Sequence, residues 1–328
     1  MTIKSSGNPL AFSEIENEFG ANGTRSLGSY RLTQSVGTLS NLPLDTGIPT
    51  SGQIKFSDFY GKQLNIVVDC HSGGREDRIT AKNDKWNNNN LTVIGGFRSK
   101  KEGGSKIYIN VNKKFCSDKN NVNNCALKTG SWDSTATVQV DLGSNAKVFG
   151  AGGDGGSGAQ GINNSGSPGS SGTSGLGIDT NNVTVNIASG GIIRAGFGGG
   201  GGGGGGRQTD KGSDRRASGG GGGGGAGFPA GSGGQPGNGC ANGSSGSSGN
   251  ETTAGDGGGG GNNGNQAYGA TGGEGGQFGE AANNGGSSQA GGGSGGGDGA
   301  AIRRNSGFSV TINNSGTIQG SSSATGVS

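Results

Sequence analysis

Nine consecutive glycines, Gly198–Gly206, stand in the second half of the chain and exclude the usual route to a folded core. Further glycine blocks follow at Gly219–Gly225, Gly257–Gly261 and Gly291–Gly299, the last interrupted by a serine and an aspartate. Glycine has no side chain to bury, and ordering its backbone costs about 1–2 kcal/mol per residue, the most of any residue type. A fold built on such blocks must take its stability from the backbone itself.

The overall composition excludes several classes of protein. Of 328 residues, 83 are glycine and only 26% are hydrophobic, whereas an ordinary enzyme domain is about half apolar. Collagen would need glycine at every third position and abundant proline, but six prolines occur here. No apolar run approaches the roughly 18 residues of a membrane-spanning helix, and residues 1–7 lack the apolar core of a signal peptide. We therefore expect no membrane insertion.

Composition rules alone would class residues 150–328 as a disordered tail. Glycine, however, leaves every N–H and C=O accessible, and chains without Cβ atoms can approach closely. Extended segments in a left-handed threefold conformation, related to polyproline II, can then bond to several neighbours at once. Because the glycine blocks alternate with connectors of unlike composition, we expect a lattice of packed polyglycine segments rather than disorder.

A strand-turn-strand pattern occurs three times, at Val138–Val148, Val183–Ile193 and Val310–Ile318. Each copy has an alternating strand, a turn of Ser, Asn and Gly, and a second short strand. The first two copies run directly into glycine. We interpret the copies as β-hairpins. The predicted fold is thus mostly β and irregular, with a small β domain followed by a glycine-rich domain of packed polyglycine II segments on a β-hairpin base.

The chain divides into three predicted domains. Residues 1–62 form an attachment segment, residues 63–149 a β-sandwich-like domain, and residues 150–328 a glycine-rich receptor-binding domain whose first base hairpin begins at about 135. Residues 63–149 contain 13 basic and 8 acidic residues. They lack the clustered arginines with interleaved aromatics that nucleic-acid binders use, so we expect no nucleic-acid partner.

Aromatic residues mark the segment 1–62. A capping box at Ser13–Glu16 predicts a short helix that ends at Gly20 and carries one apolar stripe. A second aromatic group surrounds a turn near Ser57. Because the segment is too small to bury a full core of its own, we expect it to dock either on a partner or on the next domain. The residues expected to face a partner are Phe12, Ile15, Phe19, Phe56, Phe59 and Tyr60.

The connectors between glycine blocks carry the candidate binding residues, because loops on a rigid scaffold commonly bind ligands. Arg207–Ser218 is the most charged connector, and the others hold a few aromatics. We expect Tyr268 and the charged cluster to be exposed and Phe278 to be buried. The predicted receptor-binding residues are Arg207, Lys211, Asp214, Arg215, Arg216, Phe228 and Tyr268.

No constellation of residues indicates catalysis. The single histidine, His71, follows Cys70 but has no third group at a recognisable spacing, which favours a structural role. Cys116 and Cys125 are spaced for a disulfide that staples a hairpin, with free thiols as the alternative, and not for a zinc site. No Lys-Ser or Lys-Thr follows a phosphate-loop frame. We therefore expect no enzyme activity, no metal and no cofactor.

Glycine motifs that alternate with irregular segments behind a short amino-terminal region resemble the adhesins at the tips of long tail fibres in T-even-type bacteriophages. Residues 12–20 and 48–61 are similar to a short module of many phage virion proteins. The resemblance implies polyglycine II helices, intervening segments that select a host receptor, and an amino-terminal part that fixes the adhesin to a trimeric fibre.

The function expected from this resemblance is that of a tail-fibre adhesin. Its partners would be another tail-fibre or virion protein, through residues 1–62, and a host outer-surface protein or glycan. It would be made in the host cytoplasm and reside in the virion. Two alternatives are a structural virion protein without a receptor and a glycine-rich ice-binding protein. The irregular connectors disfavour the second.

Overall fold

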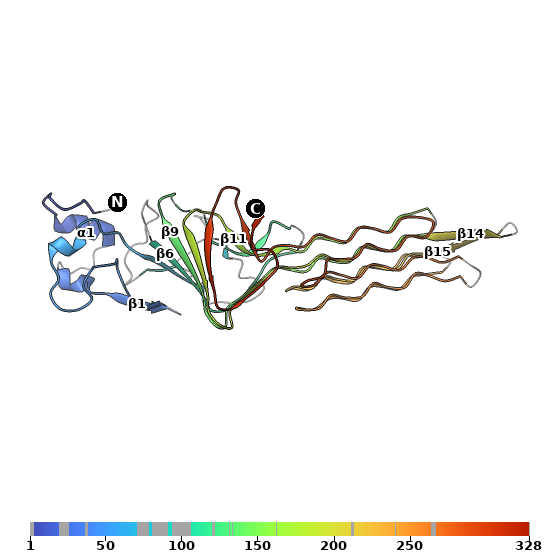
Figure 1. Cartoon of the computed structure of the whole chain (residues 1–328), viewed down its shortest axis with the longest axis horizontal. Coiled ribbons are helices and arrows are strands. Elements are labelled where there is room, and N and C mark those ends of the chain that lie inside the picture. The colour runs from blue at the N-terminus through green and yellow to red at the C-terminus, as the bar shows by residue number, and fades with distance from the viewer. Residues whose placement is uncertain are drawn as a thin grey trace.

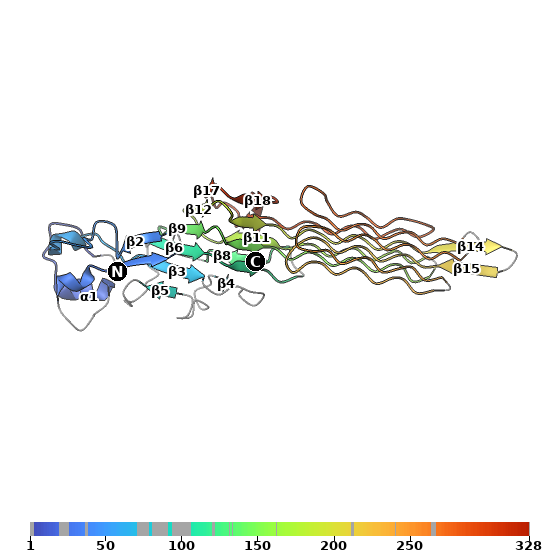
Figure 2. The same cartoon turned by 90° about the horizontal axis from the view of Figure 1, so that it is seen from below.

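The computed structural model is elongated, with three parts in a row along its longest axis (Figure 1). An amino-terminal module lies at one end, a β body in the middle, and a bundle of extended glycine-rich segments reaches to the other end (Figure 2). The structure describes residues 3–19, 26–36, 39–70, 79–80, 91–93, 106–119, 122–130, 132, 134–161, 163–210, 213–239, 241–263 and 267–327.

The amino-terminal module combines one helix, α1 (Phe12–Phe19), with the 3-10 helices η1 (Leu27–Tyr30) and η2 (Phe56–Phe59) and an antiparallel pair, β1 (Thr33–Val36) and β2 (Leu39–Pro43). The predicted helix is present, but its cap differs. Glu14 accepts a hydrogen bond from the N–H of Ala11 at 2.7 Å, so this carboxylate, rather than the side chain of Ser13, closes the first turn.

The β body is a three-sided parallel solenoid, in which the chain visits three sheets in turn and each strand returns beside its counterpart from the previous coil. The sheet orders are β17-β12-β9-β6-β3-β5, β18-β13-β10-β7 and β19-β16-β11-β8-β4. Among the described strands of these three sheets, β5 is the one that runs antiparallel to its neighbour. The strands are β3 (Ile66–Cys70), β4 (Ile79–Thr80), β5 (Leu91–Val93), β6 (Lys106–Val111), β7 (Lys114–Cys116), β8 (Cys125–Lys128), β9 (Thr137–Leu142), β10 (Lys147–Phe149), β11 (Ser174–Ile178), β12 (Val183–Ile187), β13 (Ile192–Arg194), β16 (Ile302–Arg304), β17 (Val310–Asn314), β18 (Thr317–Gln319) and β19 (Ala324–Thr325).

The strands and turns of the three repeats are present as β9 and β10, β12 and β13, and β17 and β18, but the predicted hairpin pairing is wrong. Strand β9 pairs in parallel with β12, with Val138 opposite Val183, and β10 pairs in parallel with β13. Each polar turn is therefore a corner between two sheets. A hairpin turn and a solenoid corner share the same local sequence pattern, and only the neighbouring coil distinguishes them.

The strands of residues 63–149 do not form the expected β-sandwich: they pair in parallel with their counterparts in the next coil of the solenoid, and this pairing continues beyond residue 149. Strand β6 pairs with β9, β7 with β10 and β8 with β11, all in parallel. Alternate residues of these strands point inward, and Ile109, Val140 and Val185 are completely buried in one core. The core therefore runs continuously from β3 to the strands that follow the glycine blocks.

Both glycine-rich excursions leave the solenoid at the same corner. One spans residues 150–173, between β10 and β11, and the other spans residues 195–301, between β13 and β16. Because β10 and β13 are neighbours, the two excursions start side by side. Their backbone bonds continue the sheet ladder, from Gly150 N–H to the Arg194 carbonyl and then from Gly153 N–H to the Phe197 carbonyl.

The segment 196–206 lies at one centre of the bundle and is bonded on all sides. Gly196, Gly199 and Gly202 donate to the neighbour 164–173 at 2.8 to 2.9 Å, so every third residue faces the same segment, as the polyglycine II prediction requires. Most of the other N–H groups turn to two further segments, whereas the N–H of Gly198 bonds to the carboxylate of Asp298, and the carbonyls accept from three more segments. These five neighbours are 218–227, 282–286, 150–159, 268–276 and 290–299.

The segment 218–227 forms a second centre of the same kind. It donates to three neighbours and accepts from three, and it shares two of them with the first centre. Its other neighbours are 231–237, 241–250 and 255–261. The interior of the bundle thus consists mainly of backbone hydrogen bonds, and a small buried cluster of Ala195, Phe197 and Ala226 lies where the bundle joins the solenoid.

Substitution of a central glycine by alanine should prevent this packing. A Cβ at Gly202 would lie 1.9 Å from the carbonyl oxygen of Ser157, which belongs to bonded backbone and cannot move aside. We expect Gly202→Ala to lower the free energy of unfolding by about 3 kcal/mol or more, measured by thermal and denaturant unfolding. The control is Gly259→Ala. An added Cβ at this position would lie 3.5 Å from its nearest neighbour, the hydroxyl oxygen of Ser244, which is an ordinary contact distance. Equal stability of the two variants would contradict this account of the lattice.

Candidate functional site

The end of the molecule farthest from the amino-terminal module is a two-stranded hairpin, β14 (Gly206–Asp210) and β15 (Ser213–Ala217) (Figure 1). It begins where the glycine run stops, at Gly206. Arg207 lies opposite Arg216, and Thr209 lies opposite Asp214. Arg216 is exposed and Arg207 is half-buried. Arg215 lies on β15, and the predicted Lys211 lies outside the described residues.

Tyr268 lies beside the foot of this hairpin. Its carbonyl oxygen packs against Gly206, where an added Cβ would lie 2.0 Å away, and it accepts a hydrogen bond from the hydroxyl of Ser288 at 2.7 Å. The Tyr268 side chain is 52% exposed, as expected. We call Arg207, Arg216 and Tyr268 the distal surface.

Phe228 does not belong to the distal surface. It lies at the opposite end of the bundle, where Lys114 of β7 is 3.4 Å from the centroid of its ring. Phe278 lies in a turn at that same end and is 54% exposed, so the expectation of burial is wrong. Segments alternate in direction, so successive connectors fall at opposite ends of the bundle. Counting connectors along the sequence would have placed both residues correctly.

The turn residues at this inner end of the bundle are fixed to the solenoid by a cluster of charges and rings, which we call the base cluster. Glu251 forms an ion pair with Lys114, and its carbonyl oxygen accepts a hydrogen bond from Arg194 at 2.9 Å. Lys114 and Arg194 also lie over the ring of Phe149, at 5.3 and 4.7 Å from its centroid. Burial lowers the pKa of Arg194, and the carboxylate of Glu251 opposes this effect.

Two carboxylates replace missing backbone acceptors in the bundle. Asp154 accepts hydrogen bonds from Lys119 and from the N–H of Ser232, both at 2.7 Å. Burial acts to raise the pKa of Asp154, but these hydrogen bonds outweigh it and the pKa is lowered. Asp298 accepts from the N–H of Gly198 at 3.0 Å, and here burial prevails and raises the pKa. Side chains thus complete the lattice where a neighbouring segment ends.

The predicted attachment residues divide into two groups. Ile15, Phe19 and Phe59 are completely buried, so the expectation that they face a partner is wrong. The stripe of α1 packs against η1 and η2, and the ring of Phe59 meets the rings of Phe19 and Tyr30 edge to face, with centroids 5.8 and 5.6 Å apart. This core extends to Leu64 and to residues of the solenoid. The contact agrees with the second expectation for the segment 1–62, that it docks on the next domain of the same chain.

Three attachment residues remain accessible. Phe56 is 40% exposed, Phe12 is half-buried, and their ring centroids lie 6.0 Å apart. Tyr60 is half-buried and donates a hydrogen bond from its hydroxyl to the carbonyl of Asn8 at 2.6 Å.

Within the described part of the chain, no group of acidic, histidine and cysteine side chains is arranged to hold a metal ion. Cys116 and Cys125 lie on β7 and β8 as buried thiols, and the predicted disulfide between them is not formed. Burial is the main cause that raises the pKa of the Cys125 thiol, to about 12. His71 lies outside the described residues. In the described ranges, no helix has the length and apolar character needed to cross a membrane.

The fold defines a class of protein in which a rigid backbone lattice carries loops at the end of a shaft. The family model for the phage tail fibre adhesin Gp38 matches residues 76–323, most of the chain, and the protein belongs to that family. It is therefore a receptor-binding adhesin of a phage tail fibre, and its family is one of structural adhesins, not of enzymes. No curated protein and no solved structure matches the chain.

The base cluster should stabilise the junction between solenoid and bundle. We expect Glu251→Gln to lower the free energy of unfolding by about 1 kcal/mol at low salt, because two cations lose their carboxylate partner, and to have less effect at high salt. Asp256→Asn, an exposed carboxylate on the next segment, serves as the control. Melting curves at both salt concentrations test this, and identical curves for the two variants would contradict it.

Proposed function

We propose that the distal surface contacts the host receptor while the amino-terminal module attaches the adhesin to the fibre. The observation that carries this proposal is the separation of the two regions at opposite ends of a rigid shaft (Figure 2). A binding surface at the free end reaches the cell first, and an anchor at the other end leaves it unobstructed. The charged residues Lys211, Asp214 and Arg215 of the connector 207–218 belong to the same proposed contact.

The composition of the distal surface supports recognition of a folded receptor or a glycan on the host surface. Tyrosine and arginine are the residue types that most often dominate binding energy, because each combines a large contact area with directed hydrogen bonds. The hairpin projects beyond the lattice, so its residues can change without disturbing the backbone bonds of 196–206 and 218–227.

On the amino-terminal module, we propose Phe12, Phe56 and Tyr60 as the contact with the fibre. Phe56 is the most exposed of the predicted attachment residues, and its ring stands edge-on to Phe12. Because the rest of the predicted set forms the core of the module, this small aromatic group is what the module offers to a partner protein. Aromatic side chains of this kind are enriched where protein partners meet.

Tyr268→Ala should reduce adsorption of phage to host cells by roughly tenfold or more, since loss of a central aromatic contact typically costs at least about 2 kcal/mol. The matched control is Phe278→Ala, an equally exposed aromatic at the inner end of the bundle. Adsorption assays with phage carrying each variant, together with melting curves of the purified proteins, separate binding from folding. Equal adsorption by both variants would refute the distal assignment.

Phe56→Ala should leave the adhesin folded but reduce its incorporation into particles, because the partner loses an aromatic contact. Ser57→Ala, an exposed change on the same turn, is the control. Quantitative mass spectrometry of purified virions measures the adhesin content relative to other tail proteins. Normal incorporation of the Phe56 variant would show that attachment uses another surface.

A further inference from the structure

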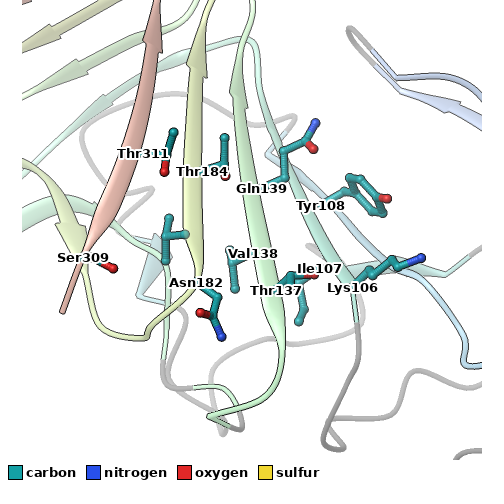
Figure 3. A pocket seen from close by; sticks show the side chains of 11 residues that line it. Lys106, Ile107, Tyr108, Thr137, Val138, Gln139, Asn182, Thr184, Ser309 and Thr311 are labelled. Carbon is teal, nitrogen blue, oxygen red and sulfur yellow. The ribbon is translucent and has the colours of Figure 1, made fainter.

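A pocket of about 360 Å³ opens on the outer face of the six-stranded sheet, far from the distal surface (Figure 3). Its floor is a row of four side chains on neighbouring strands, in direct register. Tyr108 lies opposite Gln139, Gln139 opposite Thr184, and Thr184 opposite Thr311. The strands β6, β9, β12 and β17 that carry this row are held from below by the buried core, so the row is rigid.

The lining is mostly polar, with the ring of Tyr108, one lysine and the aliphatic residues Ile107, Val138 and Val183 beside the polar groups. Hydroxyls come from Thr137, Thr184, Ser309 and Thr311, and amides come from Gln139 and Asn182. Gln139 donates its amide N–H to Asp141 and Asn182 donates to the Ser134 carbonyl, so their amide oxygens remain as acceptors. Among the lining residues Lys106 alone is charged, and it forms an ion pair with Asp45 of the amino-terminal module at 3.1 Å.

A second hollow of about 260 Å³ continues the same face, two residues further along each strand. It contains Asp141, Asn186 and Asn313, which form a hydrogen-bonded row. Asn313 donates to Asn186 and Asn186 donates to Asp141, each at 2.8 Å. Asp141 is only 4% exposed, so its charge faces the row rather than the solvent. We call the two hollows, which lie in line on one face, the groove; its two charged residues, Lys106 and Asp141, both bond to neighbouring side chains.

This chemistry selects among ligand classes. Pockets for drug-like molecules and cofactors are mostly apolar, whereas this one is lined by hydroxyls and amides. A nucleic acid or another polyanion would require several unpaired cations, and an added peptide strand would require a free sheet edge rather than a sheet face. A sugar carries hydroxyls that both donate and accept. Its apolar C–H face can pack on the accessible part of the Tyr108 ring, which also packs against the core of the amino-terminal module.

We propose that this groove is a carbohydrate-binding site for neutral oligosaccharides, separate from the distal surface. Two hollows in line accommodate a chain of sugar units better than a single unit. A glycan held beside the shaft would keep the adhesin near a polysaccharide-covered surface while the distal end finds its receptor. Binding at one site would then raise the effective concentration of the other site's ligand near the adhesin.

The test is saturation-transfer NMR of the full-length protein with a panel of short neutral oligosaccharides of hexoses and N-acetylhexosamines. The double variant Thr184→Val with Thr311→Val removes two hydroxyls from the floor and keeps side-chain shape and strand preference. We expect roughly tenfold weaker binding, because two hydrogen bonds to the ligand are lost. Thr317→Val, an exposed threonine on β18 of another sheet, is the control and should bind normally.

Two further variants make the result decisive. Thr184→Arg should fill the groove and abolish binding, and Tyr268→Ala should leave glycan binding unchanged while it reduces adsorption. Circular dichroism and melting curves establish that each variant is folded. Absence of saturation transfer from the wild-type protein to every sugar in the panel would overturn the proposal. Binding that Thr184→Arg leaves intact would also overturn it.

Discussion

The hydrogen bond between glycine backbones, made at a separation that no Cβ permits, is the interaction on which the rest of the structure depends. Ordering glycine costs more entropy than ordering any other residue, and the bundle has almost no apolar side chains to offset that cost. It succeeds because 196–206 and 218–227 are each bonded to six neighbours, so their N–H and C=O groups are satisfied without water. Close approach also adds Cα–H···O contacts along each segment.

The solenoid determines where this lattice can begin. Strands β10 and β13 are neighbours in one sheet. Beyond them, starting at the bond from Gly150 N–H to the Arg194 carbonyl, the hydrogen bonds between the two chain segments recur at every third residue. The backbone thus changes from the twofold repeat of a strand to the threefold repeat of polyglycine II where the sheet already holds the two segments at hydrogen-bonding distance. Two excursions from one corner supply the first pair of segments, and the later segments add to them. The β body therefore acts as the template of the bundle.

Much of this architecture could be predicted from the sequence, and the failures have physical causes. The blocks of glycine indicated polyglycine II, and alternation in Val183–Ile187 and Val310–Asn314 located strands correctly. The parallel pairing of these strands was not predicted, because a polar turn after a short strand occurs both in hairpins and at solenoid corners. In the amino-terminal module, the stripe containing Ile15 and Phe19 indicated burial but not what covers it, and the covering proved to be the module's own turns. Phe228 was misplaced because composition does not reveal at which end a connector lies.

The two ends of the bundle are constrained differently, and this difference follows from how each end is held. At the inner end, Lys114, Arg194 and Glu251 tie the turns to the solenoid, so a changed residue there disturbs a partly buried network. At the distal end, the connectors leave the lattice after its last backbone bonds, and their side chains make local hydrogen bonds, such as that of the Ser288 hydroxyl to the Tyr268 carbonyl. Because the interior of the scaffold is held mainly by backbone hydrogen bonds, residues of the distal connectors can vary in charge and shape at little cost to folding. A lattice with almost no side chains of its own thereby leaves binding specificity to the few residues that project beyond it.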